Sequence, residues 1–67
     1  MINMESVYNY VGKKITFKAK WDHDVNEGLL VSIDKNYLKD MVLQVQSNAK
    51  FTNVLYKELI ELEEKTQ

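Results

Sequence analysis

The sequence lacks cysteine, proline and arginine, and it has one histidine and two glycines. Without cysteine the chain forms no disulfide and no thiolate metal site. His23 alone does not build a multi-histidine site, and no Ser-His-acid arrangement accompanies it. Gly12 and Gly28 are too few for a glycine-rich phosphate loop. We therefore expect a protein that is not an enzyme and that carries no metal or other cofactor.

Long apolar segments are also missing. No apolar run approaches the ~20 residues that are needed to cross a bilayer. Residues 1–10 carry neither the basic segment nor the sustained apolar segment of a signal peptide. With no cysteine and no export signal, we expect a cytoplasmic protein with no membrane partner and no small-molecule substrate.

The net charge of −1 hides an uneven distribution. Residues 1–20 hold four lysines against Glu5 alone, whereas residues 21–67 hold nine acids against five lysines. The absence of arginine argues against bidentate recognition of phosphate or guanine, for which the planar guanidinium is the favoured group. A basic N-terminal part and an acidic C-terminal part suit head-to-tail contact between subunits or a local anion site.

At 67 residues the chain has room for one small domain, residues 1–67. Ordering it costs on the order of 100 kcal/mol, at roughly 1.5 kcal/mol per residue, so a core of this size leaves little net stability. Because disulfides and thiolate metal sites are excluded, self-association is the remaining source of stability. We expect a homo-oligomer or a chain that a partner stabilises.

The clearest element is a strand at residues 14–21. Apolar and polar side chains alternate strictly there, as in a strand with one buried face. The polar face carries Lys14, Lys18 and Lys20. Like charges along about 20 Å of strand suit contact with a phosphate backbone or an acidic protein surface. The same lysines also suit a solvated strand face that protects an exposed edge from aggregation.

Three further elements follow from local patterns. Residues 2–11 have helical spacing and precede Gly12, which predicts a short N-terminal helix. Residues 29–33 and 41–46 are short, largely apolar segments that predict two strands, and turn-forming residues separate them.

The C-terminal part fits two structures. Residues 51–56 and 60–63 fit a fourth and a fifth strand. Residues 54–64 also contain strong helix formers, with leucines on one helical face. The pattern therefore leaves open a mainly β fold with five strands and an α+β fold in which a three-stranded sheet is followed by a C-terminal helix.

Two segments resemble motifs of a known family. In residues 28–34 a glycine begins a strand and an aspartate follows six positions later, and residues 55–60 contain a Tyr-Lys pair followed by an isoleucine. From Tyr10 onward the sequence resembles the Sm-like family, and its bacterial Hfq-like members in particular. The positions that carry the resemblance are Gly28, Asp34, Asn36, Leu38, Asp40, Leu55, Tyr56, Lys57 and Ile60.

The resemblance implies a fold and a function. It implies a short N-terminal helix and five bent strands that close a small Sm-like or SH3-like barrel, with a tight turn at residues 57–59 before the last strand. It also implies a homo-oligomeric ring that binds RNA. Glu58 stands where Hfq-like members have a histidine that helps grip uridine-rich RNA, and an acid there repels phosphate. We expect RNA binding at that position to differ from the family's.

We therefore expect a non-catalytic binding module, an Sm-like RNA-binding subunit of a homo-oligomeric ring. Tyr37 lies in a polar loop beside Lys35 and Lys39 and is expected to be an exposed contact aromatic. The candidate nucleic-acid contacts are Lys14, Lys18, Lys20, Tyr37, Tyr56 and Lys57. The alternative is a small phage-type or mobile-element accessory or inhibitor protein that binds a host protein or complex. The arginine-free composition and the acidic segment 58–64 favour that alternative.

Overall fold

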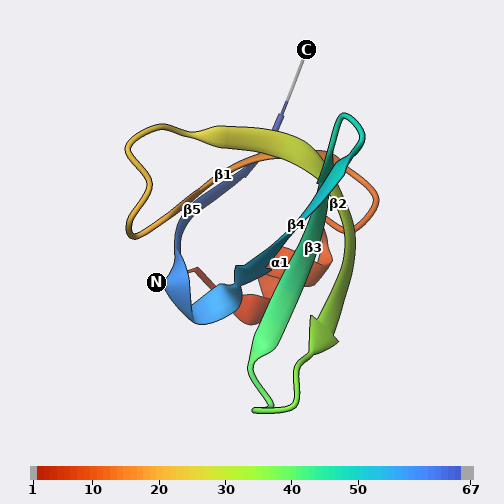
Figure 1. Cartoon of the computed structure of the whole chain (residues 1–67), viewed down its shortest axis with the longest axis vertical. Coiled ribbons are helices and arrows are strands. Elements are labelled where there is room, and N and C mark those ends of the chain that lie inside the picture. The colour runs from red at the N-terminus through yellow and green to blue at the C-terminus, as the bar shows by residue number, and fades with distance from the viewer. Residues whose placement is uncertain (1, 66–67) are drawn as a thin grey trace.

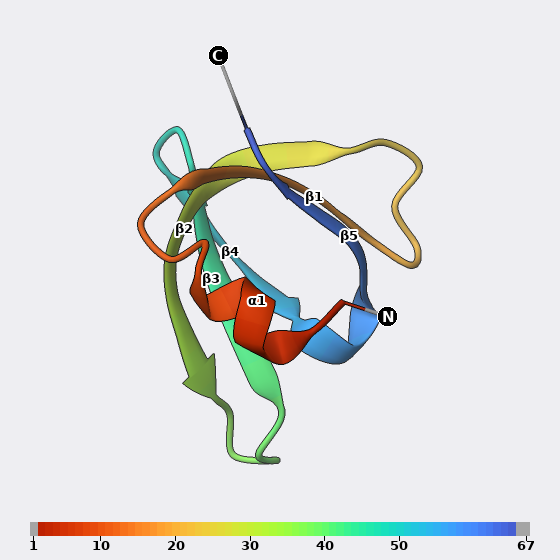
Figure 2. The same ribbon diagram turned by 180° about the vertical axis from the view of Figure 1, so that it is seen from behind.

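The computed structural model describes residues 2–65 as one short helix and five strands. The strands form one antiparallel sheet in the order β4-β3-β2-β1-β5. The sheet is strongly curved, and the helix lies across its open side (Figures 1 and 2). The elements are α1 (Met4–Tyr8), β1 (Lys14–Ala19), β2 (Asn26–Lys35), β3 (Met41–Ser47), β4 (Lys50–Leu55), the 3₁₀ turn η1 (Tyr56–Glu58) and β5 (Leu59–Glu64).

The structure confirms the mainly β fold with a short N-terminal helix and five strands. The alternative with a C-terminal helix is wrong, because residues 59–64 form β5. Within residues 2–65, β4 and β5 are the two edges of the sheet and no strand pairing joins them. The closed barrel expected from the sequence is therefore not confirmed, although the tight turn between the last two strands is present as η1.

Pairing with β1 explains why the C-terminal part is a strand. The register sets Leu62 opposite Phe17 and Glu61 opposite Lys18. Leu59 is 7% exposed, and Leu62 packs against the core. Helix propensities of ordinary residues differ by at most ~0.7 kcal/mol per residue, whereas burying a leucine side chain contributes ~1.5–3 kcal/mol. Burial and the ladder to β1 therefore outweigh the local preference for helix.

The N-terminal helix is shorter than the sequence predicts. It ends at Tyr8 rather than near residue 11. At its start, the side chain of Asn3 caps the helix by accepting a hydrogen bond from the N–H of Glu5. A helix of five residues is not stable alone in water. Val7, which is fully buried in the core, holds it against the sheet. Gly12, with φ of +87°, lies in the turn that leads into β1.

Gly28 on β2 lies in close contact with the neighbouring strand β3. It pairs with Ile15 on β1. A Cβ atom at this position would lie 2.4 Å from Cγ1 of Val45 and 2.8 Å from the carbonyl oxygen of Gln46, both on β3. Only glycine fits here, so this residue permits the tight curvature of β2 around the core.

We predict that Gly28→Ala lowers the free energy of unfolding by about 1–3 kcal/mol, because the added methyl group overpacks the contact with β3. Urea denaturation followed by circular dichroism measures the change. The control is Glu27→Ala, which removes only a surface ion pair with Lys65 and should stay within about 0.5 kcal/mol of the parent. Equal denaturation midpoints for Gly28→Ala and the parent would contradict the role given to this glycine.

Candidate functional site

The lysine row of β1 lies on the outer face of the sheet. Ile15, Phe17 and Ala19 are buried, so the alternating positions between them face away from the core. Lys14 is exposed and Lys18 is half-buried on this outer face. Lys20 follows the end of β1, and its Nζ lies 5.6 Å from the centre of the Trp21 ring, a cation–π contact.

Acidic side chains flank this row on both sides. On β5, Glu61 pairs with Lys18 and Glu63 pairs with Thr16. On β2, Glu27 pairs with Thr16. Paired residues of neighbouring strands share a face, so the outer surface of β5, β1 and β2 mixes both signs of charge. The lysines therefore do not form a continuous basic stripe.

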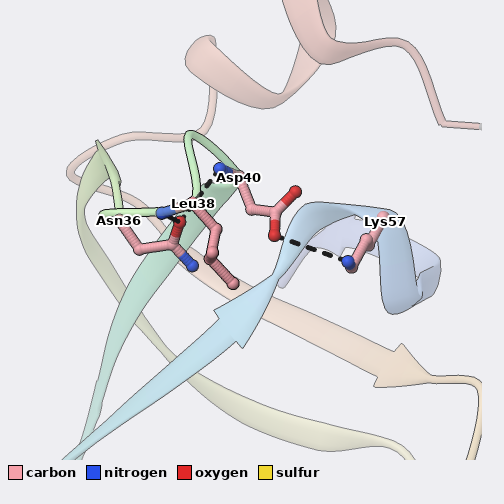
Figure 3. A network of polar contacts seen from close by, with 4 residues as sticks. All are labelled: Asn36, Leu38, Asp40 and Lys57. Atoms are coloured by element: carbon pink, nitrogen blue, oxygen red, sulfur yellow. Dashed lines mark hydrogen bonds and ion pairs between the residues drawn. The ribbon is translucent and has the colours of Figure 1, made fainter.

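The loop between β2 and β3 is held by one side chain, that of Asn36. Its Oδ1 accepts hydrogen bonds from the N–H of Leu38 at 2.9 Å and from the N–H of Asp40 at 3.0 Å (Figure 3). The backbone closes the same loop, because the N–H of Asn36 donates to the carbonyl of Asp40 at 3.0 Å and the N–H of Lys39 donates to that of Asn36 at 2.9 Å. Lys39 has φ of +66°, the left-handed conformation that the turn requires.

This loop presents the most exposed aromatic side chain in the part of the chain that the structure describes. Tyr37 is 91% exposed, and Leu38 beside it is 64% exposed. Because the loop is closed by four hydrogen bonds, the two side chains are displayed on an ordered tip rather than on a free segment. The expectation that Tyr37 is exposed is confirmed.

An ion pair joins this loop to η1. Nζ of Lys57 lies 3.4 Å from Oδ2 of Asp40, and Figure 3 shows the two side chains facing each other across the gap between the loop and the turn. The structure thus places Lys57 beside Asp40, in the loop that also carries Tyr37. We call residues 36–40 and 56–58 together the loop end.

Tyr56 has a structural role at the loop end. Its side chain is half-buried against the core, and its hydroxyl group donates to the carbonyl oxygen of Ile2. These contacts fix the N-terminal segment next to η1 and use the polar tip of the ring. No local pattern signals this contact, because its two partners lie 54 positions apart in the chain.

Glu58 lies at the wall of a groove. The groove has a volume of about 580 Å³ and lies between β4, the end of β1 and the β1–β2 connection. Apolar residues such as Phe17 and Val54 line it, and Trp21, which is 60% exposed, stands at its side. The backbone carbonyl of Glu58 accepts from the N–H of Lys20 at 2.8 Å, so η1 is tied to the end of β1.

The two edge strands each present an exposed apolar side chain. Phe51 on β4 is 58% exposed, and Ile60 on β5 is 51% exposed. Ile60 borders a hollow of about 420 Å³ that Ile2 and Leu59 also line. Edge strands with free backbone groups and exposed apolar residues are prone to pair with another chain.

Residues 2–65 contain no group of three or more side chains placed to hold a metal ion. Within the same residues, no helix has the length and apolar character that a membrane crossing needs. Comparison of the chain with protein-family models, with curated proteins and with solved structures found no match.

Proposed function

We propose that this protein is a non-catalytic, Sm-like subunit that assembles edge to edge into a ring and binds single-stranded RNA at its loop end. The resemblance in sequence implied a helix, five strands and a tight turn between the last two. The described residues have that order of elements, with η1 at the position of the turn. In the proposed assembly, the curved sheet is the incomplete wall of a barrel.

The free edges β4 and β5 support assembly. They are different strands, so the contact between them joins two unlike surfaces and is heterologous. Heterologous contacts produce closed rings or open fibres rather than two-fold dimers. A closed ring leaves no edge strand unpaired, which removes the aggregation risk of β4 and β5. It also adds buried apolar area to a core that is small for an independent domain.

One observation carries the RNA proposal: Tyr37 is 91% exposed at the tip of an ordered loop. Exposed aromatic rings bind single-stranded nucleic acid by stacking on the bases. Lys35 and Lys39 flank Tyr37 in the sequence, and Lys57 lies near the same loop. One aromatic side chain and a few lysines make a weak site. In a ring of subunits the site is repeated, so a single RNA strand gains affinity from several copies.

The mixed charge around β1 favours a second candidate, a module that binds a host protein. Lys18 lies beside Glu61, and Glu63 continues the acidic row on the outer face of β5. Alternating charges of this kind give electrostatic complementarity with a protein surface rather than with a phosphate backbone. Capture of partners from a lysate, with and without nuclease, separates the candidates. A specific partner protein retained after nuclease supports this one.

Assembly can be tested with two variants that each block one edge. We predict that Phe51→Lys, which blocks β4, and Ile60→Lys, which blocks β5, are each monomeric because both side chains are exposed at their edges. Mixed together, the two variants form a one-to-one heterodimer through the edge that each retains. Light scattering coupled to size exclusion measures the masses.

Leu38→Lys is the matched control, because Leu38 is as exposed as these residues but lies in the β2–β3 loop, away from both edges. It should assemble like the parent. Two results oppose the edge-to-edge arrangement: variants that keep the parent mass, or a mixture of the two blocked variants that stays monomeric.

For RNA binding we predict that Tyr37→Ala weakens the affinity for oligouridylate or oligoadenylate by about tenfold, since stacking contributes ~1–3 kcal/mol per base. Fluorescence anisotropy measures the affinity at two salt concentrations. Lys18→Gln is the control, because it removes one positive charge from the face flanked by glutamates and should change the affinity little. The RNA proposal fails if the parent does not bind, or if Tyr37→Ala binds as well as the parent.

A further inference from the structure

The ion pair at the loop end occupies Lys57, one of the lysines of the proposed RNA site. Oδ2 of Asp40 lies 3.4 Å from Nζ of Lys57 and presents to it the negative charge that a phosphate oxygen would also bring. The Lys57 side chain is 61% exposed, whereas that of Asp40 is 29% exposed. The lysine is thus the partner that is free to turn toward a ligand, and the aspartate is the partner that stays in place.

The position of Asp40 is fixed by its backbone and not by its carboxylate. Its N–H donates to Oδ1 of Asn36, and its carbonyl accepts from the N–H of Asn36. Its carboxylate contacts Lys57. The loop therefore holds a negative charge in front of Lys57 without using that charge to hold itself together.

We propose that Asp40 is a built-in competitor for phosphate at Lys57, so that the loop end binds RNA only by displacing the carboxylate from the ammonium group. The inference rests on the proposed RNA function and names the regulation of that site. An ion pair as exposed as this one is weak, so phosphate can displace it, at a cost of about two- to fivefold in affinity for each copy engaged. A strand that contacts several copies overcomes this competition more readily than a short one does.

The test is the affinity of the full-length chain for fluorescein-labelled oligouridylate, measured by anisotropy over a range of salt concentrations. Asp40→Asn removes the charge and keeps the shape and the backbone contacts of the loop. Asp34→Asn is the matched control, because Asp34 lies at the end of β2 just before the same loop and its carboxylate accepts from the hydroxyl of Ser32. Thermal unfolding checks that both variants keep the fold.

We expect Asp40→Asn to bind about two- to fivefold more tightly per copy engaged, because phosphate no longer has to displace the carboxylate from Lys57. Asp34→Asn should show a smaller change, and adding Lys57→Gln to Asp40→Asn should abolish the gain. Binding by Asp40→Asn where the parent shows none would support competition between Asp40 and phosphate at Lys57, although the RNA role proposed for the parent would then fail.

The inference alone is overturned if the parent binds oligouridylate and Asp40→Asn binds equally well. It is also overturned if Asp34→Asn gains as much, because the effect would then be one of general charge. If neither the parent nor Asp40→Asn binds oligouridylate or oligoadenylate, the proposed RNA function and the inference both fail.

Discussion

The antiparallel pairing of β5 with β1 is the interaction on which the rest of the structure depends. It turns a segment with strong helix propensity into a strand, and it buries Leu59 against the core. It sets Glu61 beside Lys18, which converts a potential basic stripe into a surface of mixed charge. It also makes β5 one edge of the sheet and leaves β4 as the other. Fold, electrostatics and the proposed mode of assembly therefore have a common origin.

Local patterns in the sequence predicted most of the strands. Strict alternation located β1, because its inward positions Ile15, Phe17 and Ala19 are all buried. The C-terminal strand was ambiguous for a physical reason. Leu59 and Leu62 lie three positions apart, a spacing that suits one face of a helix, and in β5 both reach the core because the register with β1 shifts between Lys18 and Ala19. The resemblance to the Sm-like family favoured the strand, but local sequence alone does not contain the long-range contact that selects it.

The candidate site was predictable in its exposed parts and not in its contacts. Tyr37 was identified from its polar neighbours, and it is exposed as expected. The pairing of Asp40 with Lys57 spans 17 positions, so no local pattern signals it. The contact of Tyr56 with Ile2 was missed for the same reason, and it assigns to packing a residue that the sequence proposed as an RNA contact. The alternating Glu61 and Glu63 were the available signal for the mixed-charge face, since a fifth strand would place them together.

The proposed assembly requires that a sheet with two unlike free edges completes itself by pairing with other copies. The most direct test is the mass of the unmodified chain in solution, measured by light scattering across a range of protein concentrations. We predict a single species that contains at least three copies of the 7.9 kDa chain, because each edge-to-edge contact leaves one β4 edge and one β5 edge free until the ring closes. A monomer at every concentration, or a dimer that does not grow further, would contradict it.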